Sequence, residues 1–465
     1  MNTRIQLIFL NVPFMTYLRC ILYVLLLPLF VHANAQEIPD LPAIDTVYLQ
    51  EVRSIAFHPT NVVTGYPVVD LGKGSLTLRF DDLDGEFSKY RYSFYHCDQN
   101  WQYSTEIREF DYRRGFVEED IFDFELSLGT DVPYAHFNLQ LPNKENSFLI
   151  SGNYVLIVYK YMNGNRYPAF SRRFMVVDNQ VDVRVEQIVP RRASLARTHH
   201  ELNIYAGFDD FSIRNPFKEV NAYVFQNGVW SRGYTHIAPQ AVQRSEMSFR
   251  YPSQIVFPAV KEYRYFDIRN LNFRTERVFD IYRESDTIDV ILQTDRPRGD
   301  SYFTYFDING RYVYQNMDGI RRIAISAAEE EEIGTILNEE ESQMNRRIEL
   351  MSQYVNVHFS LNRAEVPGKD VYVVGGFNDY KLDENSLLGY DEAEKVYYKT
   401  LLMKQGYFEY LYVTRDRITG EVDWTEIEGS RFETINDYLV FIYYRPFGTF
   451  YDQLIGMTTF KSQDL

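Results

Sequence analysis

Cysteine is almost absent from this chain, since only Cys20 and Cys97 among 465 residues carry a thiol. Two cysteines cannot hold together a small loop-rich scaffold, so the disulfide-dense families of secreted miniproteins are excluded. Tryptophan is also scarce, with 3 residues, whereas tyrosine and phenylalanine contribute 38 and 34. Tyrosine and phenylalanine favour pleated, half-buried surfaces, and the composition therefore favours β-structure.

An excess of positive charge is missing as well, because the formal net charge is −17 at pH 7. The phosphates of nucleic acids and of anionic membranes repel such a molecule, so we predict neither nucleic-acid binding nor direct membrane binding. Hydrophobic residues make up 45% of the chain and charged residues 24%, which is typical of a globular protein. The length is sufficient for about three domains of ordinary size.

Long apolar runs are rare, and the one that stands out is Ile21–Val31, with Arg19 before it and Ala33–Ala35 after it. As a helix this run rises about 16 Å, which is too short for the hydrocarbon core of a bilayer. A basic residue, a short apolar stretch and a small-residue cleavage pattern are typical of a secretory signal peptide. We therefore predict that residues 1–35 are removed before Gln36 and do not anchor the chain, with translation starting at Met1 or Met15.

The common catalytic signatures are missing: the sequence contains no Gly-x-Ser-x-Gly elbow, no His-Glu-x-x-His zinc pair and no P-loop. The run His96-Cys97-Asp98 is the most enzyme-like feature, because a thiolate beside an imidazole can act as a nucleophile. Neighbouring side chains of an extended strand point to opposite faces, however, which favours a structural role for Cys97. We predict a protein without catalytic activity, cofactor or metal, and a hydrolase that uses Cys97 or a carboxylate pair remains an alternative.

Apolar and polar residues alternate over many short segments, among them Ser75–Phe80, Val181–Glu186 and Val355–Leu361. This period of two gives a strand one dry and one wet face, as the antiparallel sheets of sandwiches require. Pairs such as Asn163-Gly164 and Asn227-Gly228 supply the residues that tight hairpin turns need. The sequence therefore predicts an all-β fold of several immunoglobulin-like or early-set β-sandwich domains in tandem.

Loop-like sequence divides the chain into three predicted domains, 36–178, 179–295 and 296–465. The run Asp178–Gln180 separates two strand-like segments, and proline and glycine interrupt the pattern over Asp295–Asp300. The acidic segment Ala327–Met351 lacks alternation and is rich in helix-forming residues, so we expect an insertion that is a solvated loop or a short helix. An interaction segment is the alternative there.

Several motifs occur in a fixed order along the chain: Tyr92–Trp101, Asp111–Phe116, Val132–Tyr134, Leu141–Asn143, Ser151–Tyr154, Tyr263–Arg269, Asp307–Gly310 and Tyr443–Asp452. Together they resemble the plug protein family of the type IX secretion system. The resemblance implies a β-rich periplasmic protein that docks on the outer-membrane β-barrel translocon of that system and blocks its pore while no cargo is passing. It also implies that the chain associates with the membrane through this protein partner alone.

The resemblance singles out thirteen residues that have either a structural role or a role in an interface. They are Tyr95, His96, Cys97, Asp98, Trp101, Asp111, Tyr112, Gly115, Phe116, Pro133, Tyr134, Arg445 and Gly448.

The segment Val371–Tyr380 resembles the start of starch- and glycogen-binding early-set modules, in which aromatic rings stack on sugars. That resemblance implies a second candidate function, glycan binding by Tyr380 and Trp424 with Lys404 as a polar partner.

Overall fold

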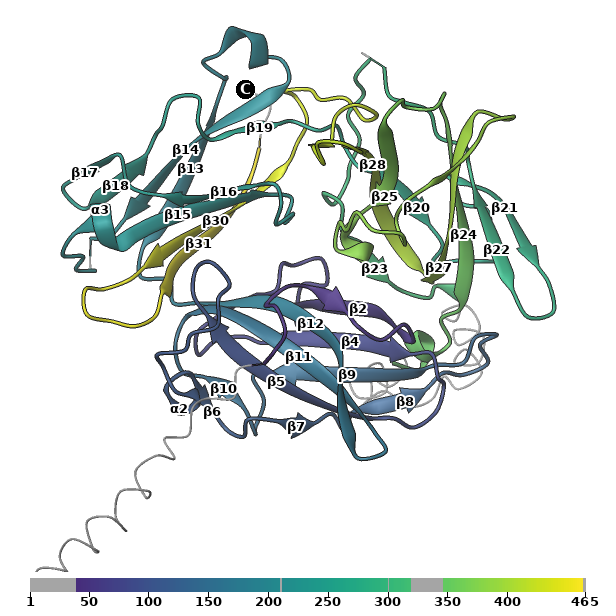
Figure 1. Ribbon diagram of the computed structural model, residues 1–465, viewed down its shortest axis with the longest axis horizontal. Helices are drawn as coiled ribbons and strands as arrows, with labels where there is room; N and C mark the ends of the chain where they lie inside the picture. The colour runs from purple at the N-terminus through teal and green to yellow at the C-terminus, as the bar shows by residue number, and fades with distance from the viewer. Residues whose placement is uncertain (1–38, 210, 300, 319–345, 463–465) are drawn as a thin grey trace, which may run out of the picture. The chain divides into compact units, whose positions relative to one another are not determined.

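The computed structural model describes residues 39–209, 211–299, 301–318 and 346–462, and its secondary structure is 47% strand and 5% helix. The predicted all-β fold is therefore confirmed. Ala43–Leu465 form one compact unit, in which three pairs of sheets enclose three hydrophobic cores (Figure 1). The predicted signal peptide, residues 1–35, and most of the acidic segment 327–351 lie outside the described residues.

The first body is a sandwich of two sheets. Its strands are β1 (Thr46–Val47), β2 (Val52–Pro59), β3 (Val68–Asp70), β4 (Leu76–Asp82), β5 (Lys89–Cys97), β7 (Glu119–Asp120), β8 (Phe124–Leu126), β9 (Ala135–Leu141), β11 (Gly152–Met162) and β12 (Asn165–Val177). One sheet has the order β1-β12-β11-β5-β7 with β3 beside β12, and the other has the order β2-β4-β9-β8. A small pair, β6 (Arg113–Arg114) and β10 (Ser147–Phe148), follows helix α2 (Glu109–Tyr112).

Aromatic rings fill the space between these two sheets. The ring of Phe80 on β4 stacks on Phe137 of the same sheet at 4.9 Å and meets Phe170 of the facing sheet edge-on at 5.0 Å. Contacts of this kind account for part of the high phenylalanine content, because large rings fill a sandwich core with few side chains.

The middle body also consists of two sheets. The first contains β13 (Asp182–Ile188), β14 (His199–Gly207), β17 (Ala241–Gln243), β18 (Glu246–Phe249) and β19 (Val256–Pro258). The second contains β15 (Val220–Gln226), β16 (Gly233–Ile237), β30 (Asp437–Tyr444) and β31 (Gln453–Lys461) in the order β16-β15-β30-β31. Two short helices, η2 (Ala193–Leu195) and α3 (Pro216–Glu219), lie between its strands in the sequence.

The third body contains the remaining strands. One sheet gathers β20 (Arg264–Asp267), β23 (Tyr312–Tyr314), β25 (Lys369–Val374) and β29 (Val422–Asp423) around β28 (Gly406–Asp416). The other has the order β21-β22-β24-β27-β26, formed by β21 (Val278–Arg283), β22 (Ile288–Leu292), β24 (Tyr354–Asn362), β27 (Val396–Lys404) and β26 (Gly389–Asp391). A short helix, η3 (Gly376–Asn378), follows β25, and residues 346–350 are helical.

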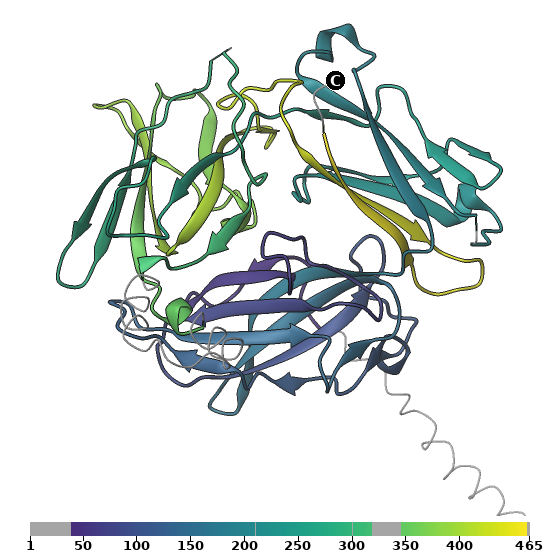
Figure 2. The same cartoon turned by 180° about the vertical axis from the view of Figure 1, so that it is seen from behind.

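The predicted division into 179–295 and 296–465 does not follow these sheets. Strand β30 pairs with β15 along its whole length, from Val220 opposite Tyr444 to Gln226 opposite Tyr438, so the C-terminal strands complete the middle body. Strands β20, β21 and β22 lie before residue 295 but belong to the third body. Figures 1 and 2 show the yellow strands β30 and β31 among the teal strands of the middle body. Alternation predicts where strands are but not which strands pair, and this is why the boundary was wrong.

Candidate functional site

The enzyme-like run His96-Cys97-Asp98 is placed at the end of β5, and its imidazole and thiol are fully buried. Burial lowers the pKa of His96 to about 4, so the imidazole is neutral at neutral pH, and its Nδ1 lies 2.8 Å from the Ser104 hydroxyl. Burial also raises the pKa of the Cys97 thiol, which stays protonated. A buried, protonated thiol is a poor nucleophile, and the neighbouring Tyr95 is buried as well.

The turn that follows β5 is stabilised by Asp98. Its carboxylate accepts hydrogen bonds from the backbone N–H groups of Asn100 at 2.8 Å and Gln102 at 2.9 Å. Between them Trp101 adopts a φ of +62°, a left-handed conformation that the two bonds to Asp98 hold in place. The family-motif residues Asp98 and Trp101 therefore define the shape of one turn.

This turn joins the first body to the middle body. The backbone N–H of Gln99 donates to the Asp452 carboxylate at 2.9 Å, and Arg445 forms an ion pair with the same carboxylate at 2.8 Å. Beside it, the Tyr443 hydroxyl donates to the side-chain oxygen of Asn153 at 2.6 Å. Two family motifs that lie more than 300 residues apart in the sequence thus meet in one interface.

An arginine between two indole rings strengthens the same interface. The Arg173 guanidinium lies 5.3 Å from the ring of Trp101 in the first body and 4.4 Å from the ring of Trp230 in the middle body. Its charge is balanced by Asp45, whose carboxylate is 2.8 Å away. Burial raises the pKa of Asp45, but the Arg173 and Arg172 charges outweigh burial and the net pKa is lowered, so the carboxylate is ionised.

A second interface, around Asp81, joins the first body to the third. The buried Asp81 carboxylate pairs with Lys404 at 2.7 Å, accepts the Tyr354 hydroxyl at 2.7 Å, and contacts Nδ1 of His136 at 2.6 Å. Lys404 also lies 4.2 Å from the ring of Tyr134, whose hydroxyl donates to the carbonyl oxygens of residues 349 and 352. The family-motif residue Tyr134 is therefore part of this interface.

The other family-motif residues lie around α2 and in two surface loops. Asp111 accepts the backbone N–H of Arg108 at 2.8 Å, and Tyr112 is fully buried. Gly115 has a φ of +115° and no room for a side chain, because a Cβ would lie 1.9 Å from the carbonyl oxygen of Glu145. Gly448 has a φ of +87° in open space, and Phe116 and Pro133 are exposed.

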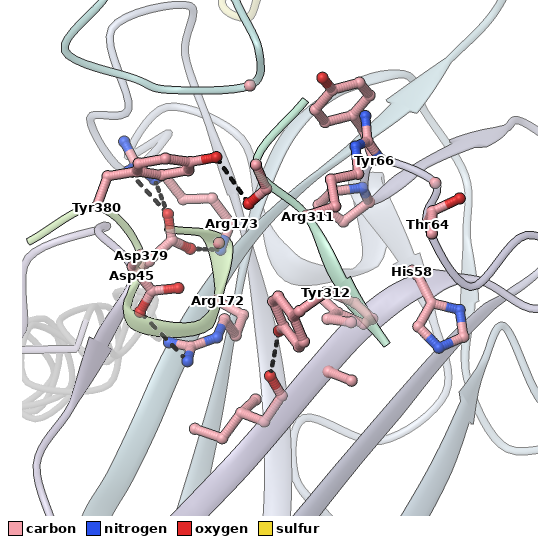
Figure 3. Close-up of a pocket in the computed structure, with 18 of the residues that line it drawn as sticks. Asp45, His58, Thr64, Tyr66, Arg172, Arg173, Arg311, Tyr312, Asp379 and Tyr380 are labelled. Carbon is pink, nitrogen blue, oxygen red and sulfur yellow. Dashed lines mark hydrogen bonds and ion pairs between the residues drawn. The ribbon is translucent and has the colours of Figure 1, made fainter. Parts of the chain in front are cut away.

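Where the three bodies meet, they line a partly open cavity of about 400 Å³ (Figure 3). Strands β2 and β12 of the first body line it together with the hairpin that follows β15, strand β23 and the loop after η3. The Tyr312 hydroxyl crosses from the third body to the carbonyl oxygen of Ile55 at 2.7 Å, and Arg311 lies over the ring of Tyr66 at 3.3 Å. Arg172 forms an ion pair with Asp379 at 3.4 Å.

The cavity therefore contains charges that are paired with one another. It also contains His58, whose pKa is lowered chiefly by burial, so this imidazole is neutral at neutral pH. These ion pairs and hydrogen bonds between bodies indicate that the residues lining the cavity help to hold the three bodies together.

The predicted glycan site does not assemble as an open platform. The rings of Tyr380 and Trp424 lie 6.2 Å apart but are inclined at 56° to each other, and the Tyr380 hydroxyl donates to the carbonyl oxygen of Gly310 at 2.9 Å. The Arg232 guanidinium lies 4.9 Å from the Trp424 ring. Lys404, the predicted polar partner, is bound to Asp81 at the interface with the first body.

Sequence reasoning missed the residues that join the bodies, above all Asp81, Gln99 and Asp452. Asp81 directly follows the alternating segment Ser75–Phe80, and Asp84-Gly85, a sequence typical of tight turns, comes soon after it. A carboxylate at the end of a strand has the same sequence signature whether it lies in a turn or in a buried ion pair, so no local signal could have found it.

Comparisons with known proteins agree with this architecture. Residues 52–178 match the family model of the type 9 secretion system plug protein 1st domain. The chain is 26% identical to a hypothetical protein from Parabacteroides merdae whose crystal structure is known, with a TM-score of 0.80, over 91% of this chain and 100% of that one. A structure of trypsin-activated α2-macroglobulin from Escherichia coli is 8% identical, with a TM-score of 0.17 over 88% of this chain and 27% of that one.

No curated protein matches the chain. In the part of the chain that the structure describes, we find no helix with both the length and the apolar character needed to cross a membrane. The boundary of the matched region, residue 178, falls between the end of β12 and the start of β13. The resemblance seen in the sequence is thus confirmed, and over residues 52–178 this chain carries the first domain of the type 9 secretion system plug protein family.

Proposed function

We propose that the exported chain is a non-catalytic plug subunit, which docks on the periplasmic side of the outer-membrane translocon barrel of the type 9 secretion system. It seals the pore when no cargo is passing. The observation that carries the proposal is the match of residues 52–178 to the plug protein family. Proteins of that family are components of the secretion system, and a periplasmic location at the outer membrane follows from this membership.

The way in which the three bodies are joined supports a blocking role. A body that obstructs an opening must resist deformation, and buried ion pairs and hydrogen bonds with several partners are lost only at a high cost in free energy. Asp81 with Lys404 ties the third body to the first, and Asp452 with Gln99 ties the middle body to the first. At the cavity, the hydrogen bond from the Tyr312 hydroxyl to the carbonyl oxygen of Ile55 also ties the third body to the first.

The state of the enzyme-like residues supports a role without chemistry. His96 and Cys97 are buried, and their altered pKa values keep the imidazole neutral and the thiol protonated. A catalytic thiolate needs the opposite arrangement, an accessible sulfur with a lowered pKa. The two residues instead fix the end of β5, from which the turn to the middle body begins.

The proposal is tested by deleting the chain from the cell that produces it and measuring the entry of a large hydrophilic fluorescent probe through the outer membrane. We expect entry to rise in cells that have the translocon and to return to its former level when the chain is supplied again. In cells that lack the translocon, the deletion should have no effect. Unchanged entry in cells that have the translocon would contradict the proposed function.

A further inference from the structure

The cavity at the junction of the three bodies has the size and the lining of a small-molecule binding site. Its volume of about 400 Å³ lies within the range of roughly 300–1,000 Å³ that ligand pockets usually have. Apolar and aromatic side chains from all three bodies form most of its wall; among them are Phe57, Val63, Phe225, Trp230, Tyr312 and Phe441. A wall of this kind with a few charged groups is typical of sites for organic molecules.

Over most of the cavity, each positive group has one carboxylate partner. The pairs are Arg79 with Glu349 at 3.1 Å, Lys404 with Asp81 at 2.7 Å and Arg311 with Asp437 at 4.0 Å. His136, which also lines the cavity, contacts the carboxylates of Asp81 and Glu349. These groups therefore balance one another and leave no excess of either sign.

One part of the wall, where β12 meets the loop after η3, has more positive than negative groups. It contains three cations and two carboxylates: Arg172, Arg173 and Lys381 with Asp45 and Asp379. Arg173 lies 2.8 Å from Asp45, and Arg172 lies 3.4 Å from Asp379 (Figure 3). Among the described residues, no carboxylate lies within ion-pair distance of Lys381, whose Nζ reaches only the Thr46 hydroxyl at 3.4 Å. In a chain with a net charge of −17, this wall therefore carries one unmatched positive charge.

The loop that carries Lys381 has a strained backbone. Asp379 and Tyr380 both have a φ of +55°, in the left-handed region that residues with a side chain rarely adopt. Two hydrogen bonds hold this conformation, from the Tyr380 N–H to the Gly375 carbonyl oxygen at 3.1 Å and from the Tyr380 hydroxyl to that of Gly310 at 2.9 Å. Strained residues of this kind are commonly retained where they place binding groups.

We infer that the cavity binds a small organic carboxylate with an aromatic body, whose carboxylate pairs with Lys381 and whose rings lie against the aromatic side chains of the wall. A single carboxylate supplies the one negative charge that the wall lacks, and it accepts charge-assisted hydrogen bonds from the ammonium group. An aromatic body gains edge-on and offset contacts with the surrounding rings. Such a ligand goes beyond the proposed function, and it would touch all three bodies and stabilise their arrangement.

The inference is tested on the full purified chain with 4-benzoylbenzoate, an aromatic carboxylate that forms crosslinks when irradiated. Titration calorimetry measures its affinity beside that of 4-benzoylbenzamide, which has the same shape and no charge. We expect the carboxylate to bind at least tenfold more tightly than the amide and to raise the melting temperature of the chain. After irradiation, mass spectrometry should find the probe on peptides that contain residues 55–67, 225–231 or 310–314, which line the cavity.

The substitution Lys381→Met removes the unmatched charge and keeps a long side chain. It should weaken binding of 4-benzoylbenzoate at least tenfold and change binding of the amide by less than twofold. Lys381→Arg, which keeps the charge, should bind the carboxylate within threefold of the unchanged chain. The matched control, Lys395→Met, changes an exposed residue of the same body and should leave both affinities unchanged. Without a probe, all three variants should melt close to the unchanged chain.

Three results would overturn the inference. The first is the absence of binding by 4-benzoylbenzoate at millimolar concentration, and the second is crosslinking confined to peptides outside the cavity. The third is an affinity for the carboxylate that neither the amide replacement nor Lys381→Met reduces, because the contacts would then be apolar only. All three leave the proposed function standing, since the seal of the translocon is measured in cells and without a probe.

Discussion

At the scale of single residues, tyrosine hydroxyls explain why this chain uses so much tyrosine. Tyr312 reaches a carbonyl oxygen of another body, Tyr354 reaches Asp81, and Tyr443 reaches Asn153. Each of these side chains fills space with its ring and places a donor at the far end, which phenylalanine cannot do. Composition indicated β-structure correctly, but it could not show that these hydroxyls join separate bodies.

A buried pair of carboxylates in the third body has a direct effect on stability. Asp307 accepts the backbone N–H of Tyr263, and Glu409 accepts those of Ile308 and Gly310, each at 2.8 Å. Burial is the main cause that raises the pKa of Asp307 to about 7 and that of Glu409 to about 8. The charge of Asp307 raises the pKa of Glu409 further, and the charges of Glu262 and Asp437 raise the pKa of Asp307. The folded state therefore holds protons that the unfolded chain has lost between about pH 4 and pH 8.

We predict that Asp307 and Glu409 make the melting temperature fall as the pH rises from about 7 to about 8, because in this range histidines are largely neutral in both states and the native state still holds protons on these two carboxyl groups. The substitution Asp307→Asn should reduce this fall by about half, since an amide oxygen can still accept the Tyr263 N–H without bearing charge. Calorimetry at several pH values measures the slope. The control Glu394→Gln, at an exposed position of the same body, should leave the slope unchanged, and an equal slope for Asp307→Asn would contradict the prediction.

At the scale of elements, strands were predictable but their partners were not. The alternation over Ser75–Phe80, Val181–Glu186 and Val355–Leu361 corresponds to β4, β13 and β24. The position of Lys404 shows the limit of this reasoning: the residue ends β27 as expected of a strand, but its ammonium group reaches Asp81 at the end of β4. Lys404 and Asp81 are 323 residues apart in the sequence, and a contact between such distant residues leaves no signal in the local pattern. The prediction that Lys404 would act with Tyr380 and Trp424 came only from the resemblance to glycan-binding modules.

We predict that Lys404→Met destabilises the unit by about 3 kcal/mol, because it leaves the Asp81 charge buried with weaker compensation. Denaturant unfolding measures the loss, with Lys399→Met on the same strand as the control. The Lys399 side chain is only partly buried and bonds a single carbonyl oxygen, so its loss should cost less than about 1 kcal/mol. Equal stability of the two variants would contradict the assignment of Asp81 and Lys404 as a clamp.

At the scale of the whole molecule, the third body is inserted between strands of the middle one. The chain leaves the middle body near Val260 and returns near Ser430, and these two residues form a β-bridge. The insertion point cannot be read from composition, because both bodies have the same kind of strands and turns. Its consequence is that the middle body is made of two separate stretches of sequence.

We predict that residues 43–178 fold on their own, whereas residues 179–295 do not, because the latter lack β30 and β31 and with them half of a sheet and its core. Joining residues 179–261 to residues 429–462 through a short glycine-serine linker should restore folding, since the two ends lie side by side. Circular dichroism and dispersed amide resonances in NMR spectra measure the outcome. A folded 179–295 fragment would contradict the topology.

The return of the chain to β15 also sets an order in which the bodies can fold as the chain is made. The first body can fold as soon as β12 is available, because all of its strands are then present. The edge of β15 that will receive β30 stays open until residue 444 has emerged, and an open edge invites wrong pairing and proteolysis. Any product that stops before that point therefore carries an unfinished middle body with an unpaired strand edge.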